Sequence, residues 1–123
     1  MAKAMYVRFE APKDVQDKTY QVVELARDSG KVRKGTNEVT KIVERGDALL
    51  VVMAEDVQPE KILAHMPLLC EEKSIPYSYV ASKQELGVAS GLGKATASIA
   101  VLDAGKGKPA LDELVGKLRQ IKK

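Results

Sequence analysis

The sequence predicts an α/β domain, a three-layer α/β/α sandwich around a four-stranded mixed sheet. Segments with helical and strand patterns alternate along the chain, which favours helices packed on both faces of one sheet. The most apolar run, residues 48–54, is continuous rather than alternating, as in a strand that is covered on both faces. The length of 123 residues fits one domain over residues 1–123, which buries about two-thirds of its unfolded surface.

The first half of the chain is predicted to hold two helices and two strands. After a polar N-terminal arm, Asp14 caps a helix that Gly30 ends. A short strand around Val32 leads through a turn into a second helix, which has Gly46 as its left-handed terminator. Residues 48–54 then form the central strand. The positions that line one face of the first helix are Val15, Thr19, Val22, Val23 and Ala26.

A third helix is predicted to follow the loop at the carboxyl end of the central strand. Pro59 suits its first turn, and the helical pattern reaches about Lys73. Pro67 lies inside this helix, where it removes a backbone donor. We therefore expect a kink or a break between His65 and Leu68.

The last third of the chain alternates in the same way. Ser82 and Glu85 have the spacing of a capping box, which opens a short helix that Gly87 weakens. The other predicted segments are a strand at 77–80, a small-residue loop at 88–97, a strand at 98–102, a flexible turn at 103–109 and a final helix. The apolar stripe of that helix is Leu111, Leu114, Val115, Leu118 and Ile121.

Composition excludes several functional classes. The apolar run is far shorter than the roughly 20 residues of a membrane span, and the N-terminus lacks a signal-peptide core, so we expect a cytoplasmic protein without membrane contact. Cys70 and His65 are the only residues of their types, so they cannot build a disulfide or a metal cage, and both are predicted to be packing residues. No metal or cofactor is expected. The net charge of +3 only weakly favours a polyanionic partner.

Residues 31–45 are the central segment of the predicted site. They are predicted to form a short strand, a glycine turn and an amphipathic helix. Gly35 can adopt backbone angles closed to other residues, and Thr36 or Asn37 can cap the helix, whose free amides attract anions such as phosphate. On spacing alone, an ordinary strand-to-helix turn with a solvated basic face remains an alternative. The helix places Val39, Ile42 and Val43 on one stripe, and Asn37, Lys41, Glu44 and Arg45 on the opposite one.

Groups for catalysis do not converge in the sequence, so we do not expect an enzyme. Glu55 and Asp56 form an acidic pair after the central strand, but a receiver domain needs a third aspartate at another strand end. The loop near Gly91 resembles a P-loop but has Val88 and Ala95 where glycine and serine or threonine are needed. A small receiver or nucleotide-binding module that uses Glu55, Asp56 and this loop remains the alternative function.

RNA binding fits these residues better. Proteins that read RNA specifically contact bulges, loops and distorted helices, because the deep groove of the A-form helix hides the base edges. Asn37 can donate and accept hydrogen bonds, Glu38 can accept them from base amino groups, and Lys41 reaches the same surface one turn later. A site that also includes the small-residue loop requires both segments at one end of the sheet, so the sheet must be mixed.

Five blocks of the sequence resemble a known family. They are KGTNEVTK at 34–41, VMAED at 52–56, HMPLLCE at 65–71, IPY at 75–77 and SKQELG at 82–87. In this order they are similar to the kink-turn-binding ribosomal protein family, of the archaeal large-subunit L-seven-Ae type. The resemblance spans most of the chain. It implies binding to kink-turns, which are RNA helices sharply bent at a bulge beside tandem sheared G·A pairs.

The resemblance also implies roles for individual residues. Asn37, Glu38 and Lys41 would contact the G·A edges and the adjoining backbone. Lys94 followed by Ala95 departs from the arginine and proline of the eukaryotic small nuclear relatives, which leaves open how strictly each bulge base is read. The other implied contacts are Arg33, Lys34 and Gly35 at the phosphates, Lys83 at the backbone, and Ile62, Leu92, Gly93 and Lys94 over the bulge nucleotides.

The partners that the resemblance implies are RNAs and the proteins assembled on them. These are ribosomal RNA in the large subunit, box C/D and H/ACA guide RNAs, and ribonuclease P RNA. Scaffold and methyltransferase proteins of the guide particles would be met mainly through the RNA. The chain would then fix an RNA bend while its partners hold the catalytic sites.

Overall fold

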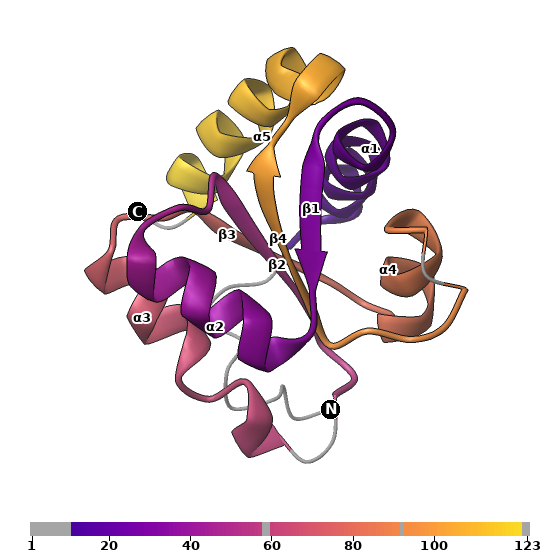
Figure 1. Cartoon of the computed structure of the whole chain (residues 1–123). Coiled ribbons are helices and arrows are strands. Elements are labelled where there is room, and N and C mark those ends of the chain that lie inside the picture. Colours follow the sequence, from indigo (N-terminus) through magenta and orange to yellow (C-terminus); the bar gives the residue numbers. More distant parts are fainter. Residues whose placement is uncertain (1–10, 58–59, 92, 122–123) are drawn as a thin grey trace.

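A mixed sheet lies between two layers of helices in the computed structural model, which describes residues 11–57, 60–91 and 93–121 (Figure 1). The strands are β1 (Lys31–Lys34), β2 (Leu50–Ala54), β3 (Tyr77–Val80) and β4 (Ser98–Asp103), in the order β1-β4-β2-β3. β4 is antiparallel to its neighbours β1 and β2, whereas β2 and β3 are parallel. The predicted four-stranded mixed sheet is confirmed.

Helices cover both faces of this sheet. α1 (Lys13–Ser29), α4 (Lys83–Ala89) and α5 (Lys108–Ile121) form one layer, and α2 (Thr36–Arg45) and α3 (Met66–Glu72) form the other (Figure 1). β2 is buried along its whole length, as its continuous apolar run predicts. Each large apolar side chain buried there stabilises the fold by about 1.5–3 kcal/mol.

The predicted faces of the first two helices are confirmed, whereas the predicted cap of α1 is wrong. α1 starts one residue before Asp14, after Pro12, and the Asp14 carboxylate instead accepts a hydrogen bond from Lys117 Nζ of α5 at 3.0 Å. Gly46 follows α2 with a φ of 77°, the expected left-handed terminator. The buried residues are Val15, Thr19, Val22, Val23 and Ala26 in α1, and Val39, Ile42 and Val43 in α2.

The predicted third helix is broken, slightly before the expected place. A short 3-10 helix, η1 (Glu60–Ile62), is separated from α3, which begins at Met66. Pro67 lies in the first turn of α3, where its missing donor leaves no helical hydrogen bond unmade. The break therefore comes before Pro67. The prediction for Pro59 falls outside the described residues.

The two residues predicted to be packing residues have different environments. Cys70 is completely buried, as expected. His65 is exposed, and its Nε2 lies 2.9 Å from the Thr40 hydroxyl of α2. That hydroxyl also donates to the carbonyl of Thr36 at 2.7 Å, so the histidine ring links α3 to α2. The packing prediction for His65 is wrong because the helix break places it at the start of α3, at the surface.

Two boundaries in the last third differ from the prediction. The Ser82 hydroxyl accepts a hydrogen bond from the amide of Glu85, as the capping box predicts, but α4 continues to Ala89, so the loop begins at Ser90. Most of residues 103–109, predicted as a flexible turn, form the short 3-10 helix η2 (Gly105–Gly107) and the start of α5. The amide of Lys106 donates to the Ser29 hydroxyl at 2.8 Å, which holds η2 against the end of α1.

The two edges of the sheet differ in exposure. β3, at one edge, is fully buried. Among the strands of the described residues, β1 lies at the other edge, pairs with β4 only and exposes Lys31, Arg33 and Lys34. The exposed edge is therefore strongly basic.

Tyr20 joins α1 to α4, and its titration should be visible in the stability of the protein. Its hydroxyl donates to Glu85 Oε2 at 3.3 Å. Burial, with the charge and hydrogen bond of Glu85, raises the pKa of Tyr20 to about 12. An unfolded chain loses this proton near pH 10, so between about pH 10 and 12 the folded state binds more protons than the unfolded state. The stabilisation is complete below this window and is lost as the pH rises through it.

We therefore expect the alkaline decline of the free energy of unfolding to be shallower for Tyr20→Phe than for the unmodified protein. Urea unfolding from about pH 9 to about pH 12, across the tyrosine titration range, measures both slopes. Lysines also titrate there, but they are common to both proteins, so the difference isolates Tyr20. Two parallel curves would contradict the assignment.

Candidate nucleic-acid interface

The direction of β4 decides which loops meet. Because β4 runs opposite to the other three strands, the segment that precedes it lies beside the turn that follows β1. The Gly35 amide donates to the carbonyl of Ser98 at 3.3 Å, and the hydroxyls of Thr36 and Ser98 are 3.4 Å apart. The glycine turn and the small-residue loop therefore share one end of the sheet, as the predicted site required.

Gly35 gives the turn its shape. It has a φ of 89° and a ψ of 133°, and a Cβ atom there would meet no atom within 4 Å, so glycine is needed for conformation rather than for space. Gly35 occupies the N-cap position of α2, and no side chain of residues 11–57, 60–91 or 93–121 caps this helix. The prediction that Thr36 or Asn37 is the cap is therefore wrong. The first turn of α2 therefore starts at the Gly35 turn, at the end of the sheet that the Gly35–Ser98 hydrogen bond marks.

The polar side chains of α2 project from this turn. Asn37, Glu38 and Lys41 are exposed, and within the described residues none of them makes a side-chain hydrogen bond or ion pair. Lys41 is one turn beyond Asn37, so the two residues lie on the same side of the helix. An amide, a carboxylate and an ammonium group are thus presented together, and no side chain in the described part of the protein occupies them.

A surface groove connects the β1–α2 segment to the start of the loop. Its volume is about 330 Å³. The guanidinium of Arg33 donates to the backbone carbonyl of Val32 at 3.1 Å and remains exposed. The lining residues are Val32, Arg33, Lys34, Glu38, Ser90 and Ile99. Of the predicted site, Arg33, Lys34 and Glu38 therefore share this groove with the first loop residue.

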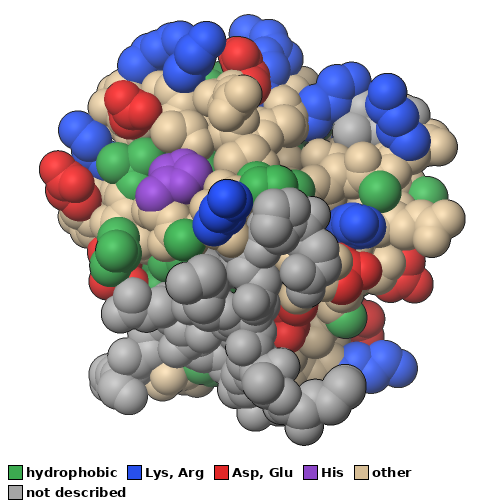
Figure 2. Space-filling view, turned by 90° about the horizontal axis from the view of Figure 1, so that it is seen from below, with side chains coloured by type: hydrophobic (Ala, Val, Ile, Leu, Met, Phe, Trp, Pro, Cys, Tyr) green, Lys and Arg blue, Asp and Glu red, His purple; other side chains and the backbone are tan. Residues whose placement is uncertain are grey.

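The remaining predicted residues surround this end of the sheet. Ile62 ends η1 and is exposed, with 39% of its surface accessible. Lys83 is the first residue of α4, and Gly93 and Lys94 are exposed in the loop. The prediction for Leu92 falls outside the described residues. Figure 2 shows this end of the molecule, with lysine and arginine side chains at several points around the face.

Close backbone packing fixes the far part of the loop. A Cβ atom on Gly87 would lie 1.9 Å from the carbonyl oxygen of Lys94, so only glycine permits this approach. The Thr96 amide donates to the carbonyl of Lys83 at 3.1 Å, and the Ala54 amide to that of Ala97 at 3.0 Å. Ser90, Thr96 and Ser98 were missed by sequence reasoning, because their part in the site depends on how the strands pair.

One member of the acidic pair considered for a receiver-type site, Asp56, has a structural contact. Asp56 Oδ1 accepts a hydrogen bond from the backbone amide of Lys83 at 2.9 Å, at the first turn of α4. Within the described ranges, no group of three or more His, Cys, Asp and Glu side chains could hold a metal ion. In those same ranges, no helix has the length and hydropathy to cross a membrane.

An α/β/α fold that presents an amide, a carboxylate and several cations at one end of its sheet suits a protein that binds a polyanion such as nucleic acid. Residues 17–110 match the ribosomal protein L7Ae/L30e/S12e/Gadd45 family, and the chain belongs to this family. It is an RNA-binding protein of the ribosomal and ribonucleoprotein type. This family is not an enzyme family.

A solved structure gives the same assignment. The Giardia lamblia 15.5kD RNA binding protein is 29% identical to this chain and superposes with a TM-score of 0.87. The match covers 95% of this chain and 97% of that one.

Proposed function

We propose that this protein recognises kink-turns, RNA helices bent at a short bulge beside tandem sheared G·A pairs, and stabilises their bent form. The observation that carries the proposal is the exposed group of Asn37, Glu38 and Lys41, which lies at the same sheet end as the small-residue loop. Membership of an RNA-binding family supports it.

The chemistry of this surface suits a non-canonical base pair. A sheared G·A pair leaves base edges exposed to a protein. A side-chain amide can donate hydrogen bonds to these edges and accept them, and a carboxylate can accept a hydrogen bond from a base amino group. Asn37 and Glu38 take these roles. The cations Arg33, Lys34, Lys41 and Lys83 contact phosphates, with Gly35 leaving room for the backbone and the first-turn amides of α2 adding positive potential.

Stabilisation of the bend follows from differential affinity. A protein shifts the equilibrium between extended and kinked RNA only by binding the kinked form more tightly. We expect only the kinked form to bring the bulge bases within reach of both Ile62 and the loop. Ile62 and loop residues 92–94 then cover apolar base surface, which adds contacts that the extended form lacks.

The proposed biological roles are those of a scaffold. The protein would serve in the large ribosomal subunit, in box C/D and H/ACA guide particles and in ribonuclease P, and thus in tRNA processing, within the cytoplasm. Scaffold and methyltransferase proteins of the guide particles would be recruited mainly through the bent RNA.

A gel shift with paired RNAs tests the proposal. One RNA carries a kink-turn, and its matched control replaces the two G·A pairs with Watson–Crick pairs at the same length. The proposal expects tight binding to the first and only weak, salt-sensitive binding to the second. Equal affinity for both RNAs would overturn it.

Lys41→Ala should make binding less sensitive to salt as well as weaker. Each phosphate contact that is lost lowers the slope of log affinity against log salt by about 0.7–0.9. The slope is measured by titrations at several potassium chloride concentrations, with Lys106→Ala as the control. Lys106 is exposed on η2, which follows the opposite end of β4. An unchanged slope for Lys41→Ala would argue against a phosphate contact there.

A further inference from the structure

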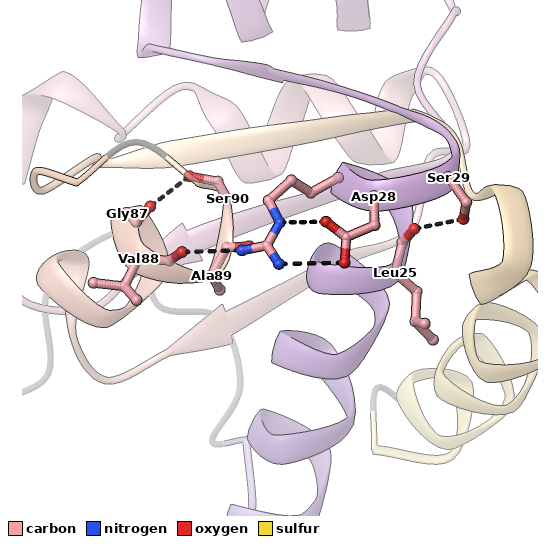
Figure 3. A network of polar contacts seen from close by, with 8 residues as sticks. Leu25, Asp28, Ser29, Gly87, Val88, Ala89 and Ser90 are labelled. Carbon is pink, nitrogen blue, oxygen red and sulfur yellow. Dashed lines mark hydrogen bonds and ion pairs between the residues drawn. The ribbon is translucent and has the colours of Figure 1, made fainter.

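The loop that begins at Ser90 is held at its start by an arginine of α1, which packs beside α4 in the same layer. Arg27 Nη1 donates to the carbonyl of Ala89 at 3.2 Å and to that of Val88 at 3.4 Å (Figure 3). These are the last two carbonyls of α4, and that of Val88 also accepts a hydrogen bond from the Gly91 amide at 3.0 Å. A guanidinium at a helix C-terminus also interacts favourably with the negative end of the helix dipole.

Asp28 holds the guanidinium in this orientation. Arg27 Nε donates to Asp28 Oδ1 at 2.9 Å, and Nη2 donates to Oδ2 at 3.3 Å (Figure 3). The two parallel hydrogen bonds fix the plane of the guanidinium, which leaves Nη1 directed at α4. The hydrogen bond from Arg27 lowers the pKa of Asp28, so both groups are charged at neutral pH.

The aliphatic part of Arg27 lies directly against the loop. Gly91 has a φ of 81°, and a Cβ atom on it would lie 2.8 Å from Arg27 Cδ. The start of the loop therefore rests on the arginine stem while the guanidinium caps the helix before it. The far part of the loop is held separately, by the close approach of Gly87 and Lys94.

We propose that Arg27, oriented by Asp28, is a positioning residue that holds the start of the loop, at Ser90 and Gly91, in its RNA-binding conformation before RNA arrives. The inference rests on the function proposed above. A loop of small residues has little packing of its own, and ordering it on binding would reduce affinity. Anchoring its start to α1 removes part of that loss in advance.

The pair allows a test in which charge and positioning make opposite predictions. Arg27→Ala makes the protein less positive, whereas Asp28→Ala makes it more positive. If only long-range attraction mattered, Asp28→Ala would bind RNA more tightly. If positioning matters, both variants bind a kink-turn RNA more weakly, by roughly three- to tenfold and mainly through faster dissociation. The matched control is Arg119→Ala, an exposed arginine of α5 outside the site.

Two further measurements separate positioning from direct contact. Hydrogen exchange in the free protein should become faster at the amides of Ser90 and Gly91, which donate to Leu86 and Val88, while the β2 amides stay protected. The slope of log affinity against log salt should stay unchanged. Arg27→Lys should restore affinity only in part, because lysine keeps the charge but lacks the forked donor geometry of a guanidinium. Thermal unfolding confirms that each variant is folded.

The inference is overturned by unchanged or tighter binding of Asp28→Ala, by full rescue with lysine, by unaltered exchange at Ser90 and Gly91, or by a reduced salt slope for Arg27→Ala. The last result would mean that Arg27 contacts a phosphate itself. These results leave the proposed function standing as long as the unmodified protein still discriminates the kinked RNA. Loss of that discrimination would overturn the proposed function instead.

Discussion

Replacing Asn37 or Glu38 with alanine should weaken binding to a kink-turn RNA by about 1–3 kcal/mol each, the range for a paired base-edge contact. Both side chains are exposed and make no side-chain hydrogen bond within the described residues, so each substitution removes an RNA contact without disturbing the fold. The loss should be largest for RNA with intact G·A pairs and small for the control duplex. Affinities from gel shifts or calorimetry with both RNAs give the comparison.

Glu38 makes this prediction especially discriminating. Removing a carboxylate makes the protein more positive, so non-specific attraction to RNA should increase. Weaker binding by Glu38→Ala therefore means that the carboxylate contacts the RNA directly. Glu44→Ala is the matched control, because Glu44 is an exposed acid later on the same helix. If neither Asn37→Ala nor Glu38→Ala changes affinity, the assigned site is wrong.

Gly87→Ala should both destabilise the protein and weaken RNA binding. Alanine favours an α-helix over glycine by about 1 kcal/mol, which alone would stabilise α4. The new Cβ, however, would lie 1.9 Å from the carbonyl oxygen and 2.7 Å from the carbonyl carbon of Lys94. Both are backbone atoms, so the segment itself must move, and overpacking typically costs about 1–3 kcal/mol. We expect the clash to prevail and to displace Lys94.

Gly116→Ala is the matched control for this substitution. Gly116 lies in α5, and a Cβ there would meet no atom within 4 Å, so alanine should stabilise the protein by up to about 1 kcal/mol. Urea unfolding and RNA titration of both variants should therefore give opposite signs for stability and a loss of affinity only for Gly87→Ala. Unchanged affinity of Gly87→Ala would remove the loop from the proposed site.

Local patterns predicted most of the fold. The α1 face from Val15 to Ala26 repeats with helical spacing, and the β2 run is apolar throughout, so periodicity alone identifies both elements. The caps were harder to predict, because several residues near each helix start can serve. Asp14 was expected to cap α1, but the helix begins after Pro12 and Asp14 pairs with Lys117, which is distant in sequence.

The candidate site was likewise predictable only where its residues are neighbours in the sequence. Residues 34–41 are contiguous, so the turn and the polar tip of α2 could be read from one short segment. The order of the strands could not be read from the sequence. It is the antiparallel placement of β4 that brings Ser98 against Gly35. Arg27 gave no signal, because its partners at Val88 and Ala89 are some sixty positions away in the chain. His65 was misjudged since the helix break that exposes it was placed too late.

The basic edge strand has a consequence for the protein when RNA is absent. An open strand offers unpaired backbone groups on which another copy of the chain could add its own strand, the first step of aggregation. Lys31, Arg33 and Lys34 stand along that strand, and two copies brought edge to edge would set these charges against each other. The repulsion opposes self-association. The cations that attract a polyanion therefore also protect the RNA-free protein against edge-to-edge aggregation.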